Sequence, residues 1–161
     1  MNLQILNADY LNTQHAKDIS YLLNCYSLDE MGNNEELPLD IRNNIAKELS
    51  KLSNSFTFLA YIDNQAVGII TCFVNFSTFK CKPLISIHDI FVHKDYRNKG
   101  ISQKLLQEVQ IEAKKRDCCK ITLEVLQGNN IAQNSYKKFG FNPYELDPKM
   151  GQALFWEKTI I

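Results

Sequence analysis

A short basic turn stands between two apolar segments of this sequence. Residues 96–106 read YRNKGISQKLL, with Arg97, Lys99 and Gly100 just ahead of an apolar-periodic stretch. A strand that enters a helix through such a turn directs backbone N–H groups at one point, where the helix dipole adds positive potential. Gly100 permits close backbone approach. The pattern predicts a phosphate-like anion site, although a plain loop with solvated charges has the same residues.

Familiar nucleotide and metal motifs do not account for this turn. The sequence contains neither G-x-x-x-x-G-K-[ST] nor G-x-G-x-x-G, so a Walker or a dinucleotide site is not expected. The five cysteines form no C-x-x-C pair, and no Cys or His has metal-ligand spacing. We therefore expect reduced thiols in a cytoplasmic protein, with no metal.

The composition fits one globular domain over residues 1–161. The chain is 45% hydrophobic and 22% charged, with zero formal net charge, which argues against a nucleic-acid partner. No segment reaches the roughly 20 apolar residues of a membrane span, so no membrane partner is expected. The first residues show no basic region followed by an apolar run, so no secretory signal is expected.

Hydrophobic periodicity predicts alternating strands and helices. The expected strands cover residues 3–6, 56–62, 66–76, 84–92, 121–126 and 154–158. One expected helix begins near Thr13, and two others cover about 41–52 and 101–116. A further helix follows Gly128 and ends at Gly140. This order of hairpins with one strand–helix–strand unit predicts an α/β fold, a mixed sheet with helices on its faces.

The strand before the basic turn carries two titratable residues. In LISIHDIFV, simple alternation places Asp89 on an apolar face with Ile85, Ile87 and Phe91, and places His88 on the other face. His88 titrates near neutral pH, and Asp89 would do so if burial raised its pKa. Either is a candidate proton acceptor, while an ordinary surface histidine explains His88 equally well.

Two motifs in the second half resemble those of the GNAT (Gcn5-related) N-acetyltransferase family. The family loop [QR]-x-x-G-x-[GA] is similar to RNKGIS, in which Ser102 stands where the family prefers Gly or Ala. The family pattern N-x-x-A-x-x-x-Y-x-x-x-G-F is matched in register by Asn129, Ala132, Tyr136, Gly140 and Phe141. The resemblance covers residues 84–141. It implies a single-domain, mostly antiparallel sheet of about six or seven strands, splayed at the cofactor site, with about four helices.

The resemblance also implies the donor site. Acetyl-CoA would be the acetyl donor, with its pantetheine arm along the backbone of Phe91 and Val92 next to Ile90, residues that are also typical of a core. Asn129 would contact the cofactor or cap the helix that follows it. Asn130 is the alternative candidate for the helix cap. The loop amides would hold the pyrophosphate; they belong to Arg97, Asn98, Lys99, Gly100, Ile101 and Ser102.

The implied reaction is direct attack of a primary amine in a ternary complex. Tyr136 would protonate the leaving thiolate as general acid, unless it only closes the core. His88, Asp89 or a water would accept the proton of the amine. The alternatives are a non-catalytic acyl-CoA-binding regulatory domain and, less favoured, a nucleic-acid-binding module.

Residues 27–40, the acidic segment, bear on the acceptor. The segment holds five carboxylates and no Lys or Arg. In the family the corresponding segment commonly borders the acceptor pocket, which would favour a cationic amine, whereas most such runs are solvated loops. The sequence fixes neither the acceptor nor the oligomeric state, and a homodimer is left open.

Overall fold

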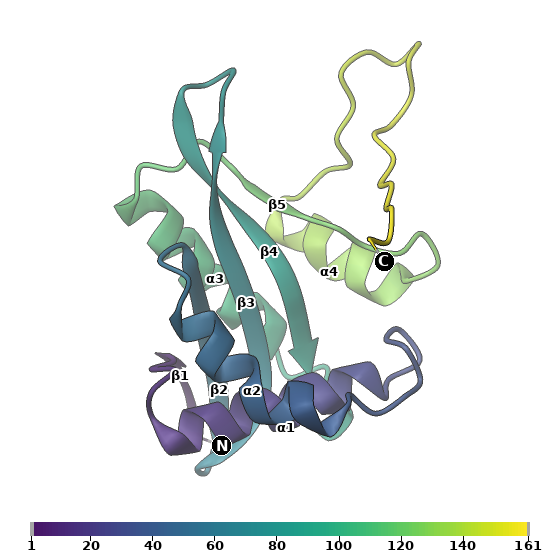
Figure 1. The fold of residues 1–161 in the computed structure, drawn as a ribbon. Coiled ribbons are helices and arrows are strands. Elements are labelled where there is room, and N and C mark those ends of the chain that lie inside the picture. The colour runs from purple at the N-terminus through teal and green to yellow at the C-terminus, as the bar shows by residue number, and fades with distance from the viewer. Residues whose placement is uncertain (1, 161) are drawn as a thin grey trace. The chain divides into compact units, whose positions relative to one another are not determined.

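The computed structural model describes residues 2–160. The chain forms two compact units, Met1–Leu123 and Glu124–Ile161 (Figure 1). The first contains a five-stranded sheet in the order β1-β2-β3-β4-β5. The first four strands are antiparallel, and β5 is parallel to β4. The strands are Leu3–Asn7, Ser55–Ile62, Gln65–Ser77, Lys82–Val92 and Ile121–Leu123.

The β2–β3 hairpin follows from its turn residues. Asp63 and Asn64 have φ of 49° and 64°, the left-handed region that Asp and Asn tolerate better than most residues. Two consecutive residues of this kind give a turn whose twist matches the flanking strands. The hairpin brings β3 to the centre of the sheet, between β2 and β4.

Helices cover both faces of this sheet (Figure 1). On one face, α1 (Thr13–Ser27) and α2 (Leu39–Ser50) pack through Ile19, Leu22 and Ala46 against Leu59, Ile69 and Phe91. On the other lies α3 (Ile101–Lys115), which packs closely against β3 at Gly68. A Cβ built at Gly68 would lie 3.3 Å from side-chain atoms of Ile101 and Leu105, so a glycine here allows the close packing of α3.

Among its described residues, the second unit holds one helix, α4 (Asn130–Phe139). Asn129 caps its start, since its side chain accepts from the Ala132 N–H at 3.1 Å. Gly140 ends the helix with φ of 111°, a conformation that favours glycine. After α4 the described residues include one isolated bridge, between Glu145 and Gln152.

The predicted α/β class, mixed and mostly antiparallel sheet, and four helices are confirmed. The sheet has five strands rather than six or seven. β5 ends at Leu123 instead of Leu126, and within the described part of the chain residues 154–158 form no strand. Leu154, Phe155 and Trp156 are each more than 70% exposed. Their apolar pattern is compatible with a strand, but a strand also needs a neighbour to pair with, which periodicity does not reveal.

Candidate active site

A β-bulge in β4 changes which residues share a face of the sheet. Thr71 pairs with Asp89 and Cys72 pairs with Ile87, which leaves His88 as an extra residue in β4. An extra residue shifts the period-two alternation by one position. Asp89 therefore lies on the face opposite to Ile87, and its predicted place on the same face as Ile85 and Ile87 was wrong.

Asp89 instead faces α1, together with Phe91. Phe91 belongs to the core cluster formed with α1 and stacks on Tyr26, with ring centroids 5.5 Å apart. Burial raises the pKa of Tyr26, and the charges of Asp89 and Asp29 raise it further. The bulge has thus brought a carboxylate to the α1 side of the sheet, a placement that simple period-two alternation does not predict.

His88 and Asp89 contact each other at this bulge. Nδ1 of His88 lies 3.2 Å from Oδ2 of Asp89, and the His88 ring meets Phe73 edge-on at 5.7 Å. The His88 side chain is 69% exposed and that of Asp89 is 22% exposed. An exposed imidazole held by a half-buried carboxylate can accept a proton from outside and share it with its partner. The two predicted base candidates therefore lie side by side.

The C-terminal half of β4 extends beyond β5. β5 pairs with β4 only from Ile85 to Ile87, whereas β4 continues to Val92. Ile90, Phe91 and Val92 lie in this extension, immediately before the short 3₁₀ helix η1 (Lys94–Tyr96) and the basic loop, residues 97–102. The strand that was expected to carry the pantetheine arm thus leads directly into the loop that was expected to carry the pyrophosphate.

The basic loop has the backbone that an anion site requires. Asn98 and Gly100 have φ of 61° and 76°, and α3 begins at Ile101 with no side-chain cap on its first turn. A Cβ at Gly100 would meet no atom within 4 Å, so this glycine is required for its conformation rather than for space. The first amides of a helix without a side-chain cap can serve an anionic group.

Arg97, one of the two cations of the basic loop, has a side chain that is engaged elsewhere. Its Nη2 donates to Oδ2 of Asp29 at 2.6 Å, its Nε donates to the Val92 carbonyl at 3.0 Å, and its guanidinium lies over the Phe91 ring at 5.7 Å. Burial acts to raise the pKa of Asp29, but hydrogen bonds from Arg97 and Met31 and the charge of Arg97 outweigh it and lower that pKa. The positive charge of Arg97 is therefore largely matched by Asp29, a partner that sequence reasoning missed.

Lys99 is also directed back onto its own loop. Its Nζ donates to the Asp95 carbonyl at 3.2 Å and lies 4.8 Å from the centre of the Tyr96 ring. A neutral carbonyl and an aromatic ring leave the ammonium charge uncompensated. Lys99 is thus the better candidate for attraction of an anion to this loop.

The two remaining predicted residues belong to the second unit. Asn129, not Asn130, is the N-cap of α4. Tyr136 lies in α4, is 9% exposed, and meets Phe141 edge-on with ring centroids 6.1 Å apart. Its backbone carbonyl accepts from Gly140 and Phe141, so the Tyr-x-x-x-Gly-Phe spacing forms a compact helix end. The motif is therefore locally ordered around the tyrosine.

Comparison with known proteins identifies the family. Residues 19–141 match the family model of the acetyltransferase (GNAT) family. The chain belongs to this family. The predicted family is thus confirmed over a region that extends well before the two motifs, into α1.

Two relatives and one solved structure illustrate the similarity. An uncharacterized N-acetyltransferase of Methanocaldococcus jannaschii is 32% identical over 101 residues, which are 62% of this chain and 45% of that protein. An aminoglycoside N(6')-acetyltransferase type 1 of Acinetobacter baumannii is 26% identical over 118 residues, 71% of this chain and 77% of that protein. The structure of AAC(6')-Iy in complex with the bisubstrate analog CoA-S-monomethyl-acetylneamine has a TM-score of 0.77 and 19% identity, with 99% of this chain and 100% of that chain covered.

The structure also bears on three other possibilities: a cysteine nucleophile, a metal site and a membrane-spanning helix. Burial raises the pKa of the Cys72 thiol, and the charge of Asp89 adds to this effect, so Cys72 is a poor nucleophile. Among residues 2–160, no group of three or more His, Cys, Asp or Glu side chains is placed to hold a metal ion. In the same part of the chain, no helix is both long and apolar enough to span a membrane.

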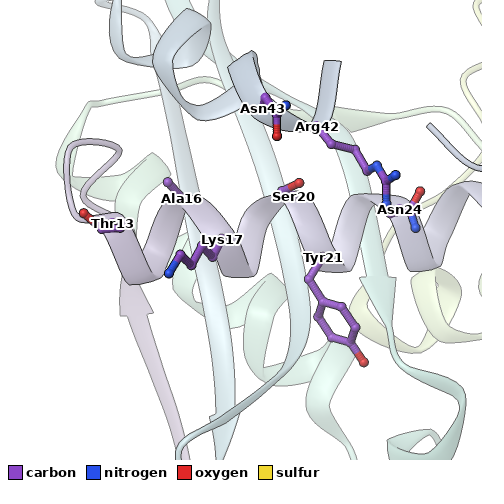
Figure 2. Close-up of a pocket in the computed structure, with 8 residues that line it drawn as sticks. All are labelled: Thr13, Ala16, Lys17, Ser20, Tyr21, Asn24, Arg42 and Asn43. Carbon is purple, nitrogen blue, oxygen red and sulfur yellow. The ribbon is translucent and has the colours of Figure 1, made fainter. Parts of the chain in front are cut away.

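A groove of about 410 Å³ is lined by residues of α1 and α2. Figure 2 shows Arg42 and Asn43 reaching it from α2, while Tyr21 projects from α1 in another direction. Its other lining residues come from α1, and none of them was predicted to bind the donor or to transfer a proton. The groove is lined by Thr13, Ala16, Lys17, Ser20, Tyr21, Asn24, Arg42 and Asn43.

Proposed function

We propose that this GNAT N-acetyltransferase transfers an acetyl group from acetyl-CoA to a primary amine by direct attack in a ternary complex. One observation carries the proposal: β4 extends past β5 and runs into a loop whose positive-φ residues precede an uncapped helix start. This gives a strand edge for an extended amide-bearing arm, followed by amides for a diphosphate. In this function residues 1–161 would act as one N-acetyltransferase domain.

The donor and the type of acceptor are supported by the relatives. One relative is an aminoglycoside N(6')-acetyltransferase, and the structure with a TM-score of 0.77 holds a bisubstrate analog that contains CoA. In this chain the loop amides of residues 97–102 would bind the pyrophosphate, and the β4 backbone at Ile90, Phe91 and Val92 would bind the pantetheine arm. The direct test is a turnover assay with acetyl-CoA against a panel of amines. Release of CoA only when an amine is present supports the proposal, and no turnover with any amine contradicts it.

The transfer also requires two proton movements. The amine must lose a proton before or during attack, and the departing thiolate must gain one. The His88–Asp89 pair at the bulge is the proposed acceptor of the first proton, and Tyr136 is the proposed donor of the second, by the register of its motif. Backbone N–H groups of β4 would stabilise the oxyanion.

Replacing His88 should change the pH profile of the enzyme. In His88→Ala, only Asp89 or water can accept the amine proton, so we expect kcat/KM to rise at higher pH than in the wild type, with a rate below pH 7 lower by roughly tenfold. The measurement is kcat/KM from pH 6 to 9. His15→Ala is the control, because His15 lies in α1, where its Nδ1 accepts the Asp9 N–H, and has no proposed role. An unchanged profile in His88→Ala would assign the proton transfer to Asp89 or to water.

The acidic segment should favour a cationic acceptor. Asp29 is paired with Arg97, and Glu36 lies 3.7 Å from Arg42, which leaves Glu30, Glu35 and Asp40 as exposed carboxylates outside these pairs. If the segment borders the acceptor site, Glu30→Gln/Glu35→Gln should lower kcat/KM for a cationic amine a few-fold at low salt. The effect should fade as salt shortens the Debye length to about 8 Å.

The comparison uses a cationic and an anionic amine of similar size, each measured at low and high salt. Glu108→Gln/Glu124→Gln serves as a control that removes two carboxylates outside the acidic segment. An equal loss of kcat/KM for the cationic amine in the two double variants would show that the acidic segment does not select the acceptor. Equal rates for the two amines in the wild type would show the same.

A further inference from the structure

Arg97 connects two parts of the first unit that are far apart in sequence. Its backbone begins the basic loop, while its side chain reaches Asp29 in the acidic segment that follows α1. The guanidinium is fixed at three points: the Asp29 carboxylate, the Val92 carbonyl and the face of the Phe91 ring. An arginine held at three points by its planar fork behaves as a rigid link rather than as a mobile charge.

Asp29 is equally fixed on its own side. Its Oδ1 accepts from the Met31 N–H at 3.2 Å, and its carbonyl accepts from the Gly32 N–H at 2.8 Å, which closes a tight turn. A Cβ at Gly32 would lie 2.2 Å from the Tyr26 carbonyl oxygen, so this turn packs directly against the end of α1. Asp29 therefore cannot follow Arg97 without moving the turn.

Hydrogen bonds connect this turn to the rest of the acidic segment. The Asn33 N–H donates to the Ser27 carbonyl at 2.9 Å, and the Ser27 hydroxyl donates to the Glu35 carbonyl at 2.7 Å. The Leu37 N–H donates to Oδ1 of Asn24 at 2.9 Å. Residues 27–37 are thus a hydrogen-bonded unit that is tied to the basic loop through Asp29.

We propose that Asp29 and Arg97 are a positioning pair. When a ligand occupies the basic loop, this pair holds the acidic segment in place. This inference rests on the proposed function, because the ligand of the loop is CoA. A diphosphate on the loop amides holds the backbone of residue 97, and Arg97 then holds the turn at residues 29–32 in place. Binding of the donor therefore stabilises the segment that is proposed to border the acceptor, and an acceptor that binds afterwards has less of this segment left to order.

The test is amide hydrogen exchange of residues 27–37 with and without saturating CoA. In the wild type we expect CoA to slow exchange in this segment by about fivefold or more. In Asp29→Asn and in Arg97→Gln the slowing should fall below about twofold, although both variants are measured at full occupancy. Asn keeps an oxygen for the Met31 N–H, so Asp29→Asn removes the charge of the pair while the turn remains.

Lys99→Gln is the matched control, because it removes a cation from the same loop without touching Asp29. This variant should need more CoA for saturation, but at saturation it should protect residues 27–37 as the wild type does. If Arg97→Gln fails to fold, as judged by its melting curve, Asp29→Asn decides alone. Full protection in Asp29→Asn, or no protection in a wild type that binds CoA, overturns the positioning role. A wild type that does not bind CoA overturns the proposed function instead.

Discussion

Tyr136→Phe is expected to lower kcat by about 100-fold and to leave the KM for acetyl-CoA nearly unchanged. Phenylalanine keeps the ring that packs against Phe141, so the buried position in α4 stays filled. The variant lacks only the hydroxyl, which is the proposed donor of a proton to the leaving thiolate. Steady-state kinetics with acetyl-CoA and a responsive amine measure both parameters.

Tyr144→Phe provides the control for this result. Tyr144 lies in the same unit and is 62% exposed, and it has no proposed part in the reaction. We expect this variant to retain the kcat of the wild type. Full activity in Tyr136→Phe would remove the hydroxyl from the mechanism, and a raised KM with unchanged kcat would assign Tyr136 to binding.

Gly100→Asp is expected to weaken the stabilisation of the protein by CoA. The residue sits at the entry to α3, and an aspartate there places a negative charge beside the proposed diphosphate site. Two like charges about 4 Å apart repel by about 1 kcal/mol in water and by about 4 kcal/mol near a protein surface. Since about 1.4 kcal/mol is a tenfold change in affinity, we expect a loss between about fivefold and about a thousandfold. Thermal shift and calorimetric titration with CoA measure it.

Gly100→Asn separates the charge from the backbone effect. Gly100 has φ of 76°, which costs either side chain about 1 kcal/mol or more, and a Cβ there meets no atom within 4 Å. Asn and Asp have the same shape and both tolerate this region better than most residues. We expect Gly100→Asn to retain clear stabilisation by CoA. Equal losses in the two variants would mean that no anion binds near residue 100.

Local patterns in the sequence were sufficient for most elements of the fold. Asn12, whose side chain accepts from the N–H groups of Gln14 and His15, starts α1, and Gly140 ends α4. The apolar spacing of residues 101–113 predicted α3, and the strand patterns of residues 56–62 and 66–76 predicted the β2–β3 hairpin. These features depend on neighbours within a few residues, so the sequence alone determines them. The two motifs also placed the chain in the GNAT family.

The composition of the site depended on long-range pairing. The face occupied by Asp89 follows from a bulge at His88, which exists only because β3 and β4 pair with a shifted register between Thr71 and Cys72. The partner of Arg97 is Asp29, which lies 68 residues away in sequence. Because sequence separation says nothing about which distant side chains meet, neither result could be predicted.

The same reason explains the strand that was wrongly predicted. Residues 154–158 carry a pattern suited to a strand, yet the described structure gives them no strand, since pairing requires a neighbour as well as a pattern. The close approach of α3 likewise depends on Gly68, a residue in β3 that has no special position in the sequence. The sequence by itself determined the helices, the hairpin, the anion-suited loop and the family. Only the tertiary structure decided which carboxylate faces α1 and which one holds Arg97, because both depend on strand register and packing between distant segments.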